Sequence, residues 1–515
     1  MNETAVVTPF ATQSPLDLSE LDPVEATPAK EVAGLAVKAR AAQRGWAKLS
    51  PRERADKLLP LKDRILDAAE RIAKLAHEEV GKPIEEALLA EVLPSADVVV
   101  YWTASIEELL ESVEVDLDPL AYPGKVGVIH KEARGVVAVI MPWNFPVALP
   151  LRSLVPALLA GNAVLFKPSE IAPRCGTLLD ELFAGLLPDG VLTVVQGGGD
   201  VGAALCAAEE VDLVVFTGSV RTGRKVAAAC AERLIPCSLE LGGKDAALVL
   251  ADADLERAAN GIVWGALGNA GQNCAAIERV YVVKEVADAF RKRVLEAVKA
   301  LTKSDVGPLT TEAQRTIVRE QVDAAKEAGA KILCGGKTSE EGYGYEPTVL
   351  EVDTDELAVM KDETFGPVLP IRVVADTAEA VERANDSRYG LTASIWTKDV
   401  AKGEELAHEL RAGVVTINNH AFTGALPGAP WSGFGETGYG ITNSPFALEG
   451  LTRPRFILVD RSRGKREVWW YPYTPILRTI ALAFAKLRSG TTGIGGKVAA
   501  LFTLIGALPK RMKGK

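Results

Sequence analysis

The sequence predicts an α/β protein built on parallel sheets with helices on both faces. Helical segments alternate with short, almost purely apolar strands, such as residues 163–166 and 213–216. Strands of this kind are buried on both faces, which is typical of parallel sheets. The 515 residues, 48% hydrophobic and 24% charged, give room for two or three domains with large cores.

Helices are expected to precede the first strands. Residues 28–72 read as two amphipathic helices, and the second begins with a capping box that has proline at the first helical position, Ser50-Pro51-Arg52-Glu53. A long helical region follows at about 83–112.

Two alternating units follow, with no internal repeat. Two β-branched runs, 125–131 and 135–141, are separated by a turn, and strands of the first unit are then expected at 163–166, 192–195, 213–216 and 237–240. The second runs from about 243 to 430, with strands at 246–250, 368–374 and 414–418 and helices near 285–302, 311–328 and 400–411.

Composition limits the class of protein. The six cysteines have no CxxC spacing and the four histidines are scattered, so we expect a reducing cytosol and no metal site. Residues 1–20 show no export signal and read as a polar arm.

Residues 461–515 carry twelve Lys/Arg and one acid, Glu467, so the net charge of −10 divides into +11 there and −21 in the body. An acidic body argues against nucleic-acid binding.

One cysteine, Cys274, lies in a polar, glycine-rich turn over residues 268–276, directly after the apolar helical run 262–267. A packing thiol usually lies among aliphatic side chains, whereas a reactive thiol needs exposure and a close backbone. From this stretch alone, a catalytic cysteine and a core cysteine buried in the turn remain equally open.

Three polar motifs follow predicted strands, where ligands of parallel sheets bind. They are Pro142-Trp143-Asn144-Phe145-Pro146, Phe166-Lys167-Pro168-Ser169-Glu170 and Phe216-Thr217-Gly218-Ser219 with Gly223. Taken singly, the first could be an Asx-turn and the second surface charges. The third could meet a phosphate at a helix N-terminus, although it is neither a G-x-G-x-x-G fingerprint nor a P-loop.

Taken in order, these motifs closely resemble the aldehyde dehydrogenase superfamily over about residues 30–460. The resemblance extends to Gly161-Asn162, Leu239-Glu240-Leu241-Gly242-Gly243-Lys244, Gly271-Gln272-Asn273-Cys274 and Glu363-Thr364-Phe365-Gly366-Pro367. It implies a Rossmann-type cofactor domain (1–112 and 135–242), an α/β catalytic domain (243–444) and a β oligomerisation arm (113–134 and 445–460). Residues 461–515 lie beyond the resemblance, and their charge and apolar periodicity predict a basic amphipathic extension.

The resemblance assigns the catalytic roles. Cys274 is expected to attack an aldehyde as a thiolate activated by its surroundings, and the Asn144 amide with the Cys274 N–H to hold the oxyanion. Glu240 is expected to activate the water that hydrolyses the thioester, although a buried structural ion pair is its alternative role. Relatives that transfer the acyl group to coenzyme A generally lack this glutamate, so a free carboxylic acid is the expected product.

The resemblance also implies an NAD site. Lys167 and Glu170 are expected at the adenosine ribose, Ser219 at the pyrophosphate, and Glu363 and Phe365 at the nicotinamide end. The full set of expected cofactor-binding residues is Trp143, Lys167, Ser169, Glu170, Phe216, Thr217, Gly218, Ser219, Gly223, Leu241, Gly242, Glu363 and Phe365. A carboxylate at Glu170 would repel a 2′-phosphate, which favours NAD while NADP stays possible.

The substrate is left open, because the loop after the last strand departs from the family pattern. Glu436 stands where lysine is common, residues 440–444 lack a common arginine, and Ile277 replaces a residue that is often hydroxylic. An aliphatic or aromatic aldehyde is expected. The alternatives are a succinate-semialdehyde-type enzyme, which needs a pocket arginine that the sequence cannot place, and a catalytically silent binding protein, which the intact Asn144, Glu240 and Cys274 disfavour.

The β-rich arm segments would leave open edges in a monomer, so a homodimer or homotetramer is expected in the cytoplasm. In the extension, residues 476–487 and 494–508 form apolar helical faces, and Ile494, Val498, Leu501, Phe502, Ile505 and Leu508 share one of them. Both runs fall short of the ~20 residues that span a bilayer. Peripheral membrane contact and packing on the protein's own dimer or substrate tunnel both remain open.

Overall fold

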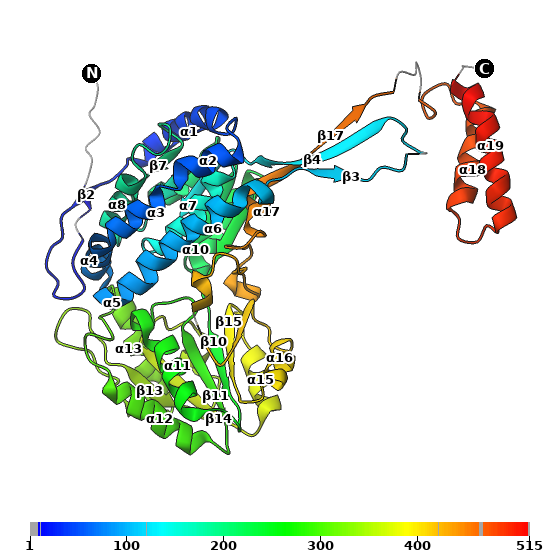
Figure 1. Cartoon of the computed structure of the whole chain (residues 1–515). Helices are drawn as coiled ribbons and strands as arrows, with labels where there is room; N and C mark the ends of the chain where they lie inside the picture. The colour runs from blue at the N-terminus through cyan, green and yellow to red at the C-terminus, as the bar shows by residue number, and fades with distance from the viewer. Residues whose placement is uncertain (1–8, 11, 120, 421, 463–466, 513–515) are drawn as a thin grey trace, which may run out of the picture. The chain divides into compact units, whose positions relative to one another are not determined.

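The structure, a computed structural model, describes residues 9–10, 12–119, 121–420, 422–462 and 467–512 (Figure 1). Two compact units form: Met1–Glu111 with Lys131–Pro454, and Ser112–His130 with Arg455–Lys515. The first part of the polar arm, residues 1–8 and 11, lies outside the described residues. After it, β1 (Pro9–Phe10) and β2 (Val24–Glu25) pair antiparallel.

The N-terminal helices differ from the two that were expected. Four α-helices form, α1 (Val32–Trp46), α2 (Pro51–Leu58), α3 (Leu61–Asp67) and α4 (Ala69–Val80). The prediction was wrong because Pro60, which has no N–H to donate, separates α2 from α3, and Ala68 leaves helical geometry before α4. The capping box at Ser50 is confirmed.

The long helix expected at 83–112 is confirmed as α5 (Ile84–Ala87), a π-helical segment η2 (Leu88–Val92) and α6 (Leu93–Leu109). Among the described residues this helix alone is long and apolar enough to cross a membrane, and half of its most apolar stretch is buried inside the protein. Buried core helices of globular proteins have the same composition. The π-helical segment carries the fully buried Glu91.

The first unit contains a five-stranded parallel sheet of order β7-β6-β5-β8-β9. Its strands are β5 (Val136–Ile140), β6 (Ala163–Lys167), β7 (Leu192–Val194), β8 (Leu213–Thr217) and β9 (Cys237–Glu240). Four helices complete this part: α7 (Ala148–Leu159), α8 (Pro173–Phe183), α9 (Gly199–Ala207) and α10 (Val220–Glu232). The predicted parallel sheet is therefore confirmed.

Alternate side chains of the central strand β5 pack on opposite faces of this sheet. Val137 and Val139 join a core with α2, α3, α6, α7 and α8, whereas Val136 and Ala138 join a core with α1, α9 and α10. The register sets Ile140 beside both Lys167 and Phe216. The carboxyl ends of the strands therefore form one edge.

The first unit holds a second sheet, of order β12-β13-β14-β11-β10-β15-β16, in which only the β12–β13 pair is antiparallel. Its strands are β10 (Asp245–Val249), β11 (Ile277–Val283), β12 (Lys331–Cys334), β13 (Thr348–Glu351), β14 (Val368–Val374), β15 (Thr392–Trp396) and β16 (Val414–Ile417). Its helices are α11 (Leu255–Leu267), α12 (Ala287–Ala300), α13 (Glu312–Glu327), α14 (Ala358–Lys361), α15 (Thr377–Asn385) and α16 (Val400–Ala407). The short α17 (Ala447–Leu451) follows them in the chain but packs on α7 in the core of the first sheet. The boundary predicted between cofactor and catalytic domains falls between these two sheets and stays a prediction.

The second unit contains a three-stranded sheet of order β17-β4-β3 and a helical hairpin. Its strands are β3 (Val113–Val115), β4 (Lys125–Ala133) and β17 (Thr452–Asp460), of which the last residues of β4 and the first of β17 belong to the first unit. The hairpin consists of α18 (Pro475–Arg488) and α19 (Ile494–Met512). Five of the predicted tail cations, Arg463, Lys465, Arg466, Lys513 and Lys515, lie outside the described residues.

Candidate active site

The turn that carries Cys274 is shaped by an unusual backbone. After α11, the 3-10 turn η3 (Gly268–Gly271) contains Asn269 and Ala270 at φ 54°, followed by Gly271 at φ 71°. This left-handed region is costly for residues with a Cβ atom, and such strain often marks functional sites. A Cβ at Gly271 would lie 2.0 Å from the carbonyl oxygen of Gly366, so only glycine permits this close approach.

Asn144, at the carboxyl end of β5, is hydrogen-bonded directly to the Cys274 turn. Its side-chain Nδ2 donates to the carbonyl of Gln272 at 3.1 Å, and Asn269 Nδ2 donates to the carbonyl of Asn144 at 2.9 Å. The Asn144 amide has two N–H groups, so one remains for a ligand. The structure therefore brings Asn144 and Cys274 together from positions 130 residues apart.

A buried ion pair holds the other side of the Asn144 loop. The Lys82 ammonium pairs with Glu91, and both side chains are 0% exposed. The same ammonium donates to the carbonyl of Asn144 at 3.0 Å. The second oxygen of Glu91 accepts the N–H groups of Val147 and Ala148 at 3.1 and 2.8 Å. The π-helical segment η2 thus fixes the loop that carries Asn144.

Glu240, the last residue of β9, lines one cavity with Cys274. The remaining lining residues are Thr217, Leu239, Leu241, Leu391, Trp431, Ser432, Gly433, Thr437 and Gly440. Burial raises the pKa of Glu240 to about 7, and the nearby Arg152 opposes this shift. A carboxyl group with this pKa exchanges protons readily near neutral pH.

The environment of Cys274 differs from the expected activating one. Burial and the negative charge of Glu240 raise the pKa of the Cys274 thiol to about 12, although Arg152 acts in the opposite direction. The thiol is half-buried, and its Sγ lies 3.8 Å from the side-chain oxygen of Asn273. The protein alone therefore keeps this thiol protonated at neutral pH, and the nucleophile needs a proton acceptor.

The residues expected at the adenosine ribose lie at the end of β6. The buried Lys167 ammonium donates to the carbonyl of Pro168 at 3.0 Å and pairs with the exposed Glu170 at 3.1 Å. Ser169 is buried and its hydroxyl accepts the N–H of Ile171 at 3.2 Å. The carboxylate and the ammonium are thus held side by side at the sheet edge.

The residues expected at the phosphates lie where β8 leads into α10. Phe216 is buried, Thr217 pairs in register with Glu240, and Gly218 follows. Ser219 caps α10, and its hydroxyl accepts the N–H of Thr222 at 3.3 Å. Gly223 lets α10 approach β9, since a Cβ there would lie 2.5 Å from Leu241. A phosphate fits the N-terminus of this helix.

The residues expected at the nicotinamide end form a second strained turn. Phe365 has φ 50°, and its ring meets Trp143 edge to face at 5.7 Å between centroids. The Glu363 carboxylate accepts the N–H of Gly243 at 3.2 Å, and a Cβ at Gly242 would lie 2.3 Å from that carboxylate. Burial raises the pKa of Glu363 to about 8, with the nearby Glu278 contributing.

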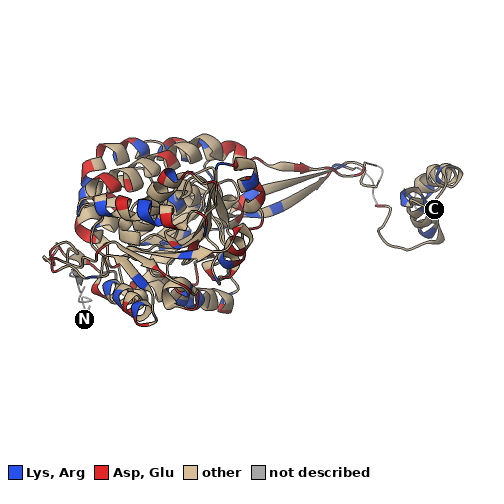
Figure 2. Ribbon diagram, turned by 90° about the horizontal axis from the view of Figure 1, so that it is seen from below, with Lys and Arg blue, Asp and Glu red and all other residues tan. Residues whose placement is uncertain are grey.

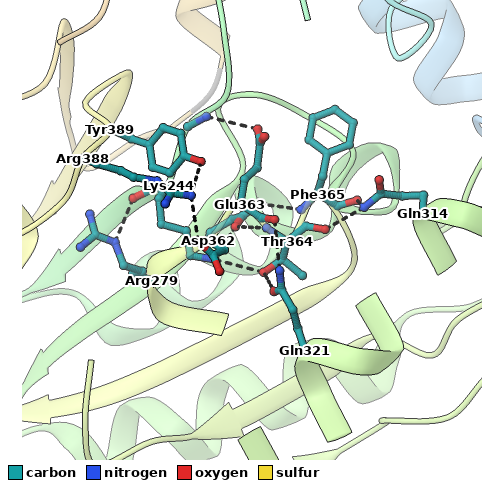
Figure 3. A network of polar contacts seen from close by, with 12 residues as sticks. Lys244, Arg279, Gln314, Gln321, Asp362, Glu363, Thr364, Phe365, Arg388 and Tyr389 are labelled. Carbon is teal, nitrogen blue, oxygen red and sulfur yellow. Dashed lines mark hydrogen bonds and ion pairs between the residues drawn. The ribbon is translucent and has the colours of Figure 1, made fainter. Parts of the chain in front are cut away.

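A buried polar network supports this turn (Figure 3). Lys244 pairs with Glu278 and donates to the hydroxyl of Thr364 at 3.0 Å. Glu278 accepts the N–H groups of Thr364 and Phe365 at 2.7 and 2.8 Å, and Gln314 donates to both of their carbonyls. The sequence motifs at Lys244 and Glu363 are thus joined in space. All the expected cofactor residues lie near the carboxyl edge of the first sheet or on this turn, a set that fits a dinucleotide.

Sequence reasoning missed Arg152, which lies on α7 and is buried. Its Nε lies 3.3 Å from the Asn443 side-chain oxygen and its guanidinium 5.4 Å from the centroid of the Trp431 ring. Its Nη2 is buried without a hydrogen-bond partner among the described residues. A lone cation inside an otherwise apolar helix was the signal that could have revealed it.

Lys82, Glu91, Glu278 and His420 were missed as well. His420 binds the far side of the nucleophile turn, with its Nε2 2.7 Å from the carbonyl of Ala275, and burial lowers the pKa of His420 to about 4. These residues carry no recognisable spacing in the sequence.

A thiol, a carboxyl group and an amide that meet beside the carboxyl ends of parallel strands are typical of a cofactor-dependent oxidoreductase. The chain belongs to the aldehyde dehydrogenase family, whose model matches residues 2–457. It is an oxidoreductase that acts on an aldehyde with NAD or NADP as acceptor. The predicted family and fold are confirmed.

The chain is similar to these relatives over most of their length. The chain is 39% identical over 474 residues to 4,4'-diapolycopene aldehyde oxidase of Methylomonas sp, covering 91% of this chain and 89% of that protein. It is 36% identical to a Mycobacterium ulcerans protein provisionally named an NADP(+) succinate-semialdehyde dehydrogenase, covering 88% and 90%. The crystal structure of PnpE in complex with nicotinamide adenine dinucleotide matches with a TM-score of 0.84 and 33% identity, over 88% of this chain and 94% of that chain.

Proposed function

We propose that Cys274, Asn144 and Glu240 carry out the oxidation of an apolar aldehyde to its carboxylic acid. The observation that carries this proposal is the shared cavity of Cys274 and Glu240, next to an Asn144 amide bonded to the same turn. A proton acceptor with a pKa of about 7 lies beside a thiol that needs deprotonation.

The steps follow from these positions. Cys274 Sγ loses its proton to Glu240 and adds to the aldehyde carbon, and the oxyanion receives hydrogen bonds from Asn144 Nδ2 and the Cys274 N–H. One such donor lowers the barrier by ~3–4 kcal/mol. A nicotinamide cofactor held by Glu363 and Phe365 would supply the hydride acceptor for this oxidation, and Cys274 then carries a thioester. Glu240, having passed its first proton to solvent, then takes a proton from water. The water oxygen attacks the thioester carbon, the C–S bond breaks, and the acid leaves with Cys274 returned as a thiolate.

The cofactor is proposed to be NAD rather than NADP. The Glu170 carboxylate would repel a 2′-phosphate, and Lys167, already paired with Glu170 at 3.1 Å, offers that phosphate only a shared charge. The ratio of kcat/KM for the two cofactors measures this preference, and equal values would contradict it.

The loop over residues 422–446 supports an apolar substrate. Five of its residues line the cavity: Trp431, Ser432, Gly433, Thr437 and Gly440. Large apolar side chains of this segment are exposed: Phe422, Leu426, Phe434, Tyr439, Ile441 and Phe446. Exposed apolar side chains that gather near a cavity often mark binding sites. The relative named for 4,4'-diapolycopene aldehyde acts on an aldehyde of this apolar kind.

We predict that Cys274→Ala abolishes NADH formation with every aldehyde while NAD binding persists. The measurement is absorbance of NADH over a panel of aldehydes graded by chain length and charge, with cofactor binding by calorimetry. If NAD binds and no aldehyde in the panel is turned over by the unaltered enzyme, the chain is instead a silent family member.

Arg152 supports a second candidate, oxidation of a semialdehyde that carries a carboxylate. Its Nη2 has no hydrogen-bond partner among the described residues, and its charge acts on both Cys274 and Glu240. A substrate carboxylate would satisfy this buried donor. The relative provisionally named for succinate semialdehyde agrees with this reading.

We predict that Arg152→Met separates the two candidates. If the substrate is a semialdehyde, kcat/KM for it falls roughly 10- to 100-fold, the equivalent of about 1.5–3 kcal/mol for a charge-assisted hydrogen bond. If the substrate is apolar, the loss of the Arg152 charge beside Cys274 and Glu240 lowers kcat/KM by the same factor for an unbranched aliphatic aldehyde as for the semialdehyde. Arg224→Met, at an exposed arginine, serves as the matched control.

We further propose that the chain assembles as a homodimer, or as a dimer of dimers, in the cytoplasm, and that residues 461–515 make peripheral contact with a membrane. Support for the assembly comes from β17, an edge strand whose side chains are exposed along almost all of its length.

A further inference from the structure

The hairpin of the second unit leaves one face of α19 uncovered within that unit. The α19 outer face consists of Val498, Leu501, Phe502 and Ile505, whose exposed fractions are 47, 45, 68 and 60%. The spacing i, i+3, i+4, i+7 places the four side chains on one side of the helix. Four large apolar side chains thus form one stripe.

The opposite side of α19 is already used inside the hairpin. Ala500 and Leu504 are buried against Ile480 and Ala483 of α18, and Leu508 packs at their margin. The side chains of the outer face therefore take no part in the core of the hairpin. The face predicted from sequence is confirmed for Val498, Leu501, Phe502 and Ile505, whereas Leu508 turns toward α18.

Charge indicates what covers the outer face. Residues 475–512 contain six Lys or Arg residues and no Asp or Glu. In Figure 2 the charged residues of the two helices are therefore all Lys or Arg. In α19 the cations Lys497, Lys510 and Arg511 flank twelve uncharged residues, 498–509. At 1.5 Å per residue this stretch measures about 18 Å, against about 30 Å for a bilayer core. The helix can therefore lie in a membrane surface but cannot cross it.

Aromatic residues lie at the C-terminal end of the same helix. Arg511 Nε donates to the carbonyl of Val468 at 3.0 Å, and its guanidinium also binds the carbonyl of Trp470. This fixes an exposed aromatic segment beside α19: Trp469, Trp470, Tyr471 and Tyr473. Tryptophan and tyrosine prefer the headgroup level of membranes.

We propose that the α19 outer face inserts into the surface of an anionic phospholipid bilayer, with the flanking Lys and Arg on the headgroups. The inference rests on the proposed peripheral contact, and it is independent of the aldehyde chemistry. A protein partner fits less well, because protein interfaces are depleted in lysine and rarely combine one apolar stripe with a purely cationic border. An interfacial helix has this composition.

The test is co-sedimentation of the full-length protein with vesicles of phosphatidylcholine alone or of phosphatidylcholine mixed with phosphatidylglycerol. Binding is expected to the anionic vesicles and to weaken as salt rises. Phe502→Asp with Ile505→Asp should lower the bound fraction at least tenfold. Leu234→Asp, at an apolar residue that is 92% exposed in the first unit, should bind like the unaltered protein.

Each variant is also assayed with a water-soluble aldehyde, so that a folding defect or a wrong enzyme assignment is seen separately from lost vesicle binding. Anionic vesicles that leave the unaltered protein in solution overturn the proposal, as does a double variant that still co-sediments. A double variant that changes the oligomeric state, with no vesicle binding by the unaltered protein, would assign the face to a second copy and also overturn it.

Discussion

At the residue scale, proton affinity decides the order of events in the candidate site. Burial raises the pKa of both the Cys274 thiol, to about 12, and the Glu240 carboxyl group, to about 7. A thiol this weakly acidic depends on a neighbouring base, and Glu240 is about half ionised at neutral pH. The buried Arg152 stabilises both anions. The pH dependence of turnover should therefore report Glu240.

We predict that kcat falls as the pH drops below about 7, because protonated Glu240 cannot accept a proton from the thiol or from water. Glu240→Gln should remove this limb and lower kcat ~10²–10⁴-fold. The measurement is kcat from pH 5 to 9 with a saturating soluble aldehyde. A variant that keeps the wild-type pH profile would show that another group supplies the base. Glu436→Gln, at a partly exposed carboxylate outside the cavity lining, is the control.

At the element scale, two turns of the second sheet, η3 before β11 and Glu363–Gly366 before β14, pack against each other and are held by buried side chains behind them. The η3 turn reaches Gly366 through Gly271, and the Glu363–Gly366 turn is held by Lys244 and Glu278. On the other side, η2 holds the Asn144 loop through Lys82 and Glu91. A widened helical turn places Glu91 where it meets the N–H groups at the start of α7, which explains why this helix departs from α geometry.

We predict that Lys82→Met leaves the buried Glu91 unpaired and lowers the free energy of unfolding by about 3–5 kcal/mol. The double variant Lys82→Met/Glu91→Leu should recover part of that stability, because no buried charge remains. Its kcat should stay low, because the Asn144 carbonyl loses the Lys82 donor and the N–H groups of Val147 and Ala148 lose Glu91. Denaturant unfolding and steady-state kinetics measure the two effects. A double variant with normal kcat would limit the pair to a stabilising role.

At the scale of the whole molecule, the β17 edge carries the proposed assembly. Phe456, Ile457, Leu458 and Val459 are 51, 44, 46 and 47% exposed on this strand. Consecutive exposed apolar residues on an edge strand promote pairing with another chain. The same edge, in a protein that stayed monomeric, would be a risk for aggregation.

We predict that Ile457→Lys with Val459→Lys converts the assembly into monomers, since residues two apart lie on the same face of a strand. Light scattering coupled to size-exclusion chromatography measures the mass. Val373→Lys, at an exposed valine of β14, should leave the mass unchanged. An unaltered mass in the double variant would exclude β17 as the main interface.

The sequence by itself determined the family, the parallel sheets and the strand ends at Asn144, Lys167, Ser219 and Glu240, because apolar periodicity and local motifs are properties of contiguous residues. The tertiary structure alone decided what surrounds them. Arg152 in the cavity region, Lys82 and Glu91 behind Asn144, and the raised pKa of Cys274 all depend on burial and on neighbours far along the chain. Desolvation and through-space charge have no signature in a linear motif, so they emerge only when the chain folds.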